Sequence, residues 1–364
     1  MRTRLRSRQR PLLIFAGLSL VTFLLYVRGR YHSVQPPILT SFAFPDSNSH
    51  SETTSPTTLD AASSSSYSKN ASHNACDVYP KDSDIVIVVK TGATEASRKI
   101  PTQLLSFLSC AKDDLLIFSD LEEDLNDLHI YDTLDSVVNE AKINNTDFSL
   151  YNTQKQYVME GGDIGSLTDR AHESWAIDKY KNVHTAQKAW ELRPNKSWYF
   201  FIDADTYIVW SSFFAWLRRF DPTEKLYLGA QVPSETVPFA HGGSGYALSR
   251  ASLAELVGVD AEDLARRFDI AAKTACCGDI ELAKILDMKE ITITDAHPMI
   301  NGEKPRSYKF GPRLWCQPVI TMHHIYAEEM RDLWQFQQRR HNPKASSIDI
   351  NHRILYILAS LFLS

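Results

Sequence analysis

Two aspartates, Asp203 and Asp205, stand one residue apart at the end of an apolar run, residues 197–202 (SWYFFI). Alternate residues of an extended segment point the same way, so both carboxylates are expected on one side of the strand end. Paired carboxylates repel each other and attract a divalent cation, and such a cation can neutralise a diphosphate. A solvated turn at a strand end, where aspartate is common, is the alternative explanation.

A third carboxylate, Asp279, follows Gly278 in the segment 276–283 (CCGDIELA), with Glu281 two residues further on. A positioned carboxylate can act as a general base that removes the proton of a hydroxyl group. If the segment opens a helix, Asp279 and Glu281 point to different sides. A helix N-cap is the alternative role for Asp279.

The elements that must hold these residues alternate between strands and helices. Continuous apolar runs, typical of strands buried on both faces, cover residues 84–90, 115–120, 197–202 and 226–230. Helical spacing of apolar side chains covers residues 95–110, 171–191 and 211–220. The β-α-β order predicts an α/β domain with a mostly parallel central sheet flanked by helices. Ligands of such sheets bind at the carboxyl ends of the strands, where Asp203 and Asp205 are expected.

Composition limits the class of protein. The chain has 364 residues, of which 43% are hydrophobic and 23% charged, with a net charge of -5. These values exclude a wholly disordered, collagenous or multi-span membrane protein. An acidic chain is not expected to bind nucleic acid, because phosphate backbones attract basic surfaces.

The N-terminal region predicts a membrane anchor and a spacer. Residues 1–10 hold five arginines and precede the uncharged run 11–27 (PLLIFAGLSLVTFLLYV). At about 1.5 Å per residue this run reaches about 25 Å, enough for a thin bilayer. The basic flank predicts a cytosolic tail at 1–10 and a single-pass type II signal anchor at 11–27. A cleaved signal peptide and a buried helix are the alternatives.

Residues 31–75 contain 17 serines and threonines and several prolines, so we expect a disordered stem. The domain is then expected at residues 76–340, in the lumen. Residues 341–364 are a tail to which the sequence assigns no role; its apolar run is too short to span a bilayer.

Cysteines and glycosylation sequons fit an oxidising lumen. Cys76 and Cys110 flank the first strand–helix unit and are candidates to pair, whereas Cys316 is a candidate partner for Cys276 or Cys277. No C-x2-C spacing exists, so a zinc site is not expected. The N-x-S/T sequons stand at Asn70, Asn144 and Asn195.

Four blocks of the chain follow the order and roughly the spacing of a known family. They are residues 198–207 (WYFFIDADTY), 241–249 (HGGSGYALS), 276–283 (CCGDIELA) and 320–325 (ITMHHI). Together they resemble the Fringe-like, core 1 β1,3-galactosyltransferase family (glycosyltransferase family 31), over about residues 84–335. Ala204 departs from the family, because it replaces the middle residue of the D-D-D motif, whereas the outer two aspartates are retained.

The resemblance implies a GT-A fold and an inverting transfer from a UDP-sugar, dependent on Mn2+ or another divalent cation. It implies Asp205 and His323 as metal ligands, with Asp203 beside them at the metal or the donor. A surface histidine next to His324 is the alternative for His323. Asp279 becomes the general base, so no covalent intermediate is required.

The residues expected to bind the donor are Lys90, Thr91, Gly92, Arg170, Lys179, Asp203, Gly242, Gly243 and His324. For Arg170 and Lys179, an ordinary amphipathic helix face is the alternative. For the glycines, a tight strand-to-helix turn is the alternative to close approach of the backbone to a ligand.

We therefore expect a β1,3-glycosyltransferase of the Golgi or ER membrane, with a UDP-sugar donor and a glycan or glycoprotein acceptor. Galactose and O-linked N-acetylgalactosamine are the sugars that the resemblance suggests, and N-acetylglucosamine or glucose are alternative donors. A non-catalytic UDP-sugar- or glycan-binding or chaperone-like relative is the second reading, which Ala204 favours. A lumenal hydrolase is the third possibility, but the sequence contains neither a nucleophile elbow nor an H-E-x-x-H motif. The sequence does not decide whether the protein forms a homodimer.

Overall fold

The computed structural model describes residues 74–308, 311, 314 and 317–340. No helix in these ranges is both long and apolar enough to cross a membrane. The predicted anchor at 11–27 and the tail at 341–364 lie outside the described residues, as does the predicted stem up to residue 73. Ala75, the last residue of the predicted stem, is buried and opens a 3-10 helix, Ala75–Val78 (η1).

The central sheet has eight strands in the order β11-β7-β10-β5-β1-β2-β4-β3. Their bounds are β1 Ile85–Lys90, β2 Leu115–Ser119, β3 Glu123–Leu125, β4 Leu128–Asp132, β5 Trp198–Asp203, β7 Tyr227–Gly229, β10 Tyr246–Ser249 and β11 Ile293–Asp295. Four of the neighbouring pairs are parallel and three, β7–β10, β10–β5 and β3–β4, are antiparallel. The predicted mostly parallel sheet is thus confirmed.

Two short antiparallel ladders lie beside this sheet: β6 (Tyr207–Ile208) pairs with β12 (Thr321–Met322), and β8 (Gln231–Val232) pairs with β9 (Phe239–Ala240). The first ladder continues the chain directly after β5. It therefore brings a segment from the C-terminal end of the domain next to Asp205, which follows β5.

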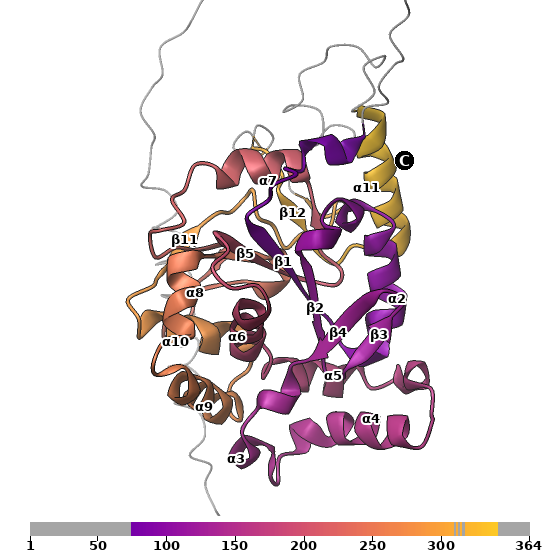
Figure 1. Cartoon of the computed structure of the whole chain (residues 1–364), viewed down its shortest axis with the longest axis vertical. Helices are drawn as coiled ribbons and strands as arrows, with labels where there is room; N and C mark the ends of the chain where they lie inside the picture. The colour runs from indigo at the N-terminus through magenta and orange to yellow at the C-terminus, as the bar shows by residue number, and fades with distance from the viewer. Residues whose placement is uncertain (1–73, 309–310, 312–313, 315–316, 341–364) are drawn as a thin grey trace, which may run out of the picture. The chain divides into compact units, whose positions relative to one another are not determined.

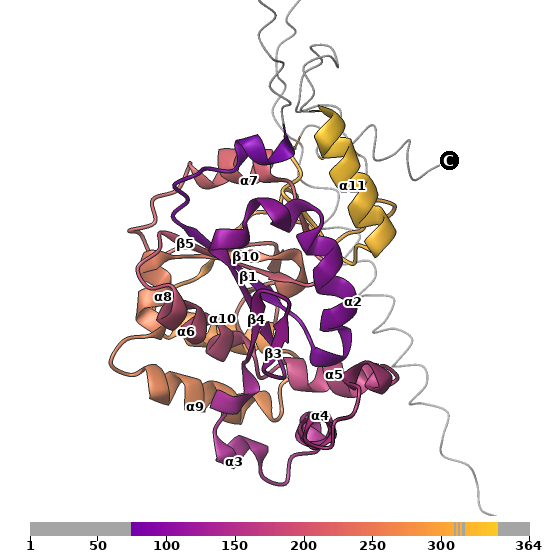
Figure 2. The same ribbon diagram turned by 45° about the vertical axis from the view of Figure 1, so that its right-hand side comes forward.

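Helices cover both faces of the sheet (Figure 1). They are α2 Ala93–Leu104, α3 Asn139–Lys142, α4 Ser149–Met159, α5 Ala171–Asp178, α6 Asn182–Leu192, α7 Trp210–Leu217, α8 Arg250–Leu256, α9 Ala261–Ala272, α10 Gly278–Asp287 and α11 Ala327–Arg340. One core cluster joins the sheet to α2, α7 and α11, and a second joins it to α6, α8, α9 and α10. Figure 2 shows α2 and α11 side by side on their face.

The side-chain alternation of β1 shows how the sequence produces these layers. Ile85, Ile87 and Val89 enter the first cluster, and Val86 and Val88 enter the second, each 5% exposed or less. A strand that is apolar at every position is stable only with both faces covered, which is the place of a central parallel strand. The predicted parallel pairing of β1 and β2 around α2 is confirmed.

The single helix predicted at 171–191 is wrong, because residues 179–181 separate α5 from α6. The side chains of Tyr180 and Lys181 are both buried there. The Tyr180 hydroxyl donates to Asp147 at 2.9 Å, and the Lys181 ammonium donates to the carbonyl oxygen of Thr91 at 2.7 Å. No glycine or proline marks this break in the sequence; contacts with distant segments produce it.

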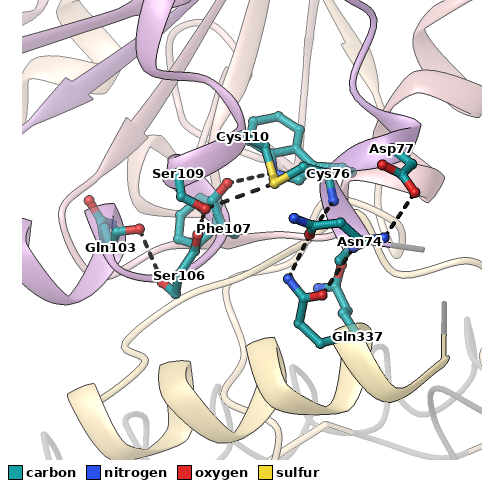
Figure 3. Close-up of a disulfide and its surroundings, with 12 residues drawn as sticks. Asn74, Cys76, Asp77, Gln103, Ser106, Phe107, Ser109, Cys110 and Gln337 are labelled. Atoms are coloured by element: carbon teal, nitrogen blue, oxygen red, sulfur yellow. Dashed lines mark hydrogen bonds between the residues drawn. A yellow bond between two sulfur atoms is a disulfide. The ribbon is translucent and has the colours of Figure 1, made fainter. Parts of the chain in front are cut away.

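A disulfide joins Cys76 and Cys110, as the sequence predicts, and ties η1 to the 3-10 helix Phe107–Cys110 (η2). Figure 3 shows it beside Ser109, whose hydroxyl lies 3.9 Å from the sulfur of Cys76. Cys276 and Cys277 form no disulfide among the described residues, and Cys316 lies outside them.

Candidate active site

The carboxyl ends of β1 and β5 lie side by side, because the parallel register pairs Lys90 with Asp203. The Lys90 ammonium lies 3.1 Å from Asp203 Oδ1 and also forms an ion pair with Asp178 of α5. Burial by itself lowers the pKa of Lys90, but Asp178 and Asp203 outweigh it and hold the pKa above its usual value. Lys90 therefore stays charged and is held between two carboxylates.

Asp205 lies beyond the end of β5, in the turn that leads to β6, and forms a cluster with two histidines. His323 Nδ1 lies 3.1 Å from Asp205 Oδ1, and His324 Nδ1 lies 3.9 Å from Asp205 Oδ2. One ligand atom from each of the three side chains lies within 4.8 Å of the other two. Asp203 points instead to Lys90, so the two aspartates face different partners within one cleft.

Charges around Asp205 keep it ionised. Burial by itself raises the pKa of Asp205, but the hydrogen bond and charge of His323, together with Lys99, hold it well below its usual range. Lys99, on α2, places its ammonium 3.2 Å from Asp205 Oδ2 and 2.7 Å from Glu95. The site thus combines a carboxylate, two imidazoles and one competing ammonium group.

Asp279 is the second residue of α10, and its carboxylate is held from two other segments. The backbone N–H of Gly242 donates to Oδ2 at 2.8 Å, and the side-chain amide of Asn182 donates to Oδ1 at 2.9 Å. Cys277, not Asp279, occupies the N-cap position of α10, so the capping alternative is wrong. Burial raises the pKa of Asp279, although Lys90 opposes this effect.

Glu281 points away from this carboxylate, as expected for a helix. It is buried and forms an ion pair with Lys284 at 2.7 Å. Of the two candidates in this segment, only Asp279 lines the cleft.

The glycine block allows close contact between the backbone and the site side chains. A methyl group on Gly242 would lie 2.5 Å from Asp279 Oδ1, and one on Gly243 would lie 2.2 Å from His323 Nε2. Both distances are shorter than contact distances, so side chains at these positions would displace Asp279 or His323. Glycine is therefore required at both positions because a side chain there would collide with Asp279 or His323.

A further group of charges, on Asp120, Asp178 and Lys181, lies next to the ends of β1 and β2. The Lys181 ammonium, whose side chain is 2% exposed, lies 3.3 Å from Asp178 and 3.7 Å from Asp120. Burial by itself raises the pKa of Asp178, but Lys90 and Lys181 outweigh it and lower the pKa. These alternating charges tie α5 and the helix break to the ends of β1 and β2.

A cleft of about 420 Å³ brings these groups together. Of the residues predicted from the sequence, it is lined by Lys90, Thr91, Gly92, Lys179, Asp203, Asp205, Gly243, Asp279, His323 and His324. Gly242 lies just behind the wall, bonded to Asp279. Arg170 does not line the cleft; it is the N-cap residue of α5 and donates to Glu173 in the first turn of that helix, at 2.8 Å.

Several lining residues were missed by the sequence analysis. One face of α5 contributes Ala171, Ser174, Trp175 and Asp178, and one face of α2 contributes Thr94, Glu95, Arg98 and Lys99. The other lining residues are Thr168, Lys181, Asn182, His241, Cys276, Cys277 and Gly278. The helical spacing of the polar residues in α2 could have revealed that face, because it directly follows a strand end. No local pattern marks Lys181 or Asn182.

Comparison with known proteins gives the family. The family described as Fringe-like matches residues 80–299. The chain belongs to the Fringe-like family. This membership makes it a glycosyltransferase, as the sequence blocks imply. A solved structure titled "crystal structure of a glycosyltransferase involved in the glycosylation of the major capsid of PBCV-1" is 11% identical, with a TM-score of 0.34; the match covers 68% of this chain and 98% of that one.

Proposed function

We propose that the chain is an inverting β1,3-glycosyltransferase that moves a sugar from a UDP-sugar to a hydroxyl group of a glycan or glycoprotein. One observation carries this proposal: Asp279 and the cluster of Asp205 and His323 line the same cleft at the carboxyl ends of β1 and β5. A base and a site for a diphosphate are what such a transfer requires. Galactose as donor sugar and O-linked N-acetylgalactosamine as acceptor follow only from the resemblance.

The side chains of Asp205 and His323 are suitable ligands for a divalent cation. Two ligands bound at about 2.1 Å to one octahedral ion, at right angles, lie about 3 Å apart. The distance from Asp205 Oδ1 to His323 Nδ1 is 3.1 Å, so these two atoms fit one ion. When bound, a cation such as Mn2+ would supply positive charge to the diphosphate as UDP leaves.

Asp279 acts on the acceptor. Its carboxylate takes the proton from the acceptor hydroxyl while the acceptor oxygen forms a bond to the anomeric carbon. The bond from that carbon to the β-phosphate oxygen breaks, and UDP departs with the electron pair. The bonds from Gly242 and Asn182 fix the carboxylate in one orientation. Because burial raises the pKa of Asp279, the ionised carboxylate is a stronger base than an exposed aspartate.

Ala204, the feature that favours the non-catalytic alternative, lies in the apolar core. Its side chain is 2% exposed and packs in the apolar core cluster that joins the sheet to α2, α7 and α11. Within the described residues, Asp203 and Asp205 line the cleft and Ala204 does not.

A lumenal location in the Golgi or ER, with a type II anchor, is part of the proposal. The Cys76–Cys110 disulfide supports an oxidising compartment. The sequon residues Asn144 and Asn195 are exposed, as glycosylation requires.

The test is transfer from UDP-galactose, UDP-N-acetylglucosamine and UDP-glucose to an N-acetylgalactosamine-bearing glycopeptide, in Mn2+ and in EDTA. We expect a β1,3-linked product from one donor, identified by NMR, and its loss in EDTA. Retained UDP binding without metal-dependent transfer from any of the three donors would instead support the binding-protein alternative.

A further inference from the structure

The short ladder of β6 and β12 decides which side chains meet Asp205. Its antiparallel register pairs Thr321 with Ile208 and Met322 with Tyr207. Continuing this register by one and two residues places His323 opposite Thr206 and His324 opposite Asp205. Side-chain and backbone contacts agree, because His323 Nδ1 lies 3.2 Å from Thr206 Oγ1 and the N–H of Ile325 donates to the carbonyl oxygen of Asp205 at 2.9 Å.

The backbone of His324 turns its ring towards the same carboxylate. His324 has a φ of +56°, a left-handed conformation that histidine, asparagine and aspartate adopt more often than most other residues with a side chain. Its ring centroid lies 3.8 Å from that of His323, and its Nδ1 lies 3.9 Å from Asp205 Oδ2. Within the described part of the chain, neither ring nitrogen of His324 forms a hydrogen bond, and 58% of the side chain is exposed.

We propose that His324 is the third protein ligand of the divalent cation, so that Asp205, His323 and His324 form a two-histidine, one-carboxylate site. The inference rests on the cation site of the proposed function and adds a ligand to it. Two ligands on opposite sides of an ion with bonds of about 2.1 Å lie about 4.2 Å apart. Because the three ligand atoms lie within 4.8 Å of one another, a shift of under about 1 Å brings them to one ion.

The third ligand changes which cation is preferred. Mg2+ binds mainly oxygen ligands and keeps several waters, whereas imidazole suits transition metals. Two imidazoles and one carboxylate are the ligand set of octahedral iron(II) sites and follow the Irving–Williams order. We therefore expect the site to prefer Mn2+, Fe2+ or Co2+ over Mg2+.

The test uses the full-length chain with Mn2+ or Mg2+, alone and with UDP. Pulsed EPR of bound Mn2+ counts the coordinating 14N nuclei, and titration gives the affinities. The variant is His324→Asn, because asparagine tolerates the left-handed backbone and the shorter side chain is less able to reach the ion. The matched control is His129→Asn, which removes an exposed histidine held between Asp124 and Glu122 at 2.7 and 2.5 Å.

We expect two coordinating nitrogens in the native chain and one in His324→Asn. Mn2+ affinity should fall about tenfold or more, by analogy with the loss of metal-site partners, whereas Mg2+ affinity should change less than about twofold. The control should retain both nitrogens. One nitrogen in the native chain, an unchanged count in His324→Asn, or no Mn2+ binding even with UDP would overturn the inference.

These readouts are independent of turnover. Two nitrogens in a chain that transfers no sugar would leave the third ligand in place and refute the proposed function. Metal-dependent transfer with a single nitrogen would retain the function and refute the third ligand.

Discussion

The side-chain amide of Asn182 donates a hydrogen bond to Asp279 Oδ1 at 2.9 Å. Asn182 is the first residue of α6, so this bond depends on the helix break at 179–181. Gly278, next to Asp279, packs against that break: a methyl group on it would lie 2.5 Å from the carbonyl oxygen of Lys179. The interruption between α5 and α6 therefore determines the orientation of the proposed base, Asp279.

Asn182→Asp tests whether this bond keeps Asp279 ionised. The Asn182 bond lowers the pKa of Asp279, and an added carboxylate raises it through like-charge repulsion. Because the base must be ionised, activity is lost as the pH falls through this pKa, so the acidic limb of the pH–rate profile should move to higher pH. At pH 6 we expect kcat to fall about tenfold or more, with KM for the donor within about twofold.

Gln187→Ala is the matched control, because Gln187 lies on the same helix and donates its amide to Leu256 and Ala261, away from the cleft. An acidic limb that stays in place in Asn182→Asp, or moves equally in the control, would show that Asn182 does not act on the base.

Lys181→Met tests the buried charges below the strand ends. The change removes the cation near Asp120, which is 1% exposed, and leaves that carboxylate without its buried counter-charge. We expect a loss of about 3 kcal/mol in the free energy of unfolding, measured by urea denaturation. Lys225→Met, which breaks an exposed pair with Glu255, should cost less than about 1 kcal/mol. Equal effects of the two substitutions would mean that the buried pair contributes no more to stability than an exposed pair.

Lys99→Met tests competition between an ammonium group and the cation at Asp205. Lys99 Nζ lies 3.2 Å from Asp205 Oδ2, and the neutral side chain should free that oxygen. Removing this competing charge should raise the affinity for Mn2+ alone about fivefold, measured by calorimetry. Lys112→Met, at an exposed position, should leave it unchanged. A lower Mn2+ affinity in Lys99→Met would contradict the competition.

The sequence predicts the parts of the fold whose signals are local. The apolar run before Asp203 fixes a buried strand, and a carboxylate just past its end must lie at the sheet edge that binds ligands. That Asp279 and His323 lie near Asp205 could be predicted only from the family resemblance, because 74 and 118 residues separate them from Asp205 along the chain.

Other features of the site depend on contacts that no local pattern records. The break between α5 and α6 overrides a good helical pattern, since Tyr180 and Lys181 find partners on distant segments. Asn182 reaches Asp279 only as a result. The role of His324 follows from the register of a two-residue ladder, which adjacent histidines in a sequence do not predict.

The most direct test compares Asp279→Asn with Asp205→Ala, by measuring transfer and Mn2+-dependent UDP binding in both. Glu281→Gln, whose side chain faces away from the cleft, is the control. We expect Asp279→Asn to lower transfer about 10²–10⁴-fold with UDP affinity within about twofold. Asp205→Ala should weaken UDP binding about tenfold or more and remove its dependence on Mn2+. Equal losses of UDP affinity in both variants, or full transfer by Asp279→Asn, would contradict the assignment of base and cation site.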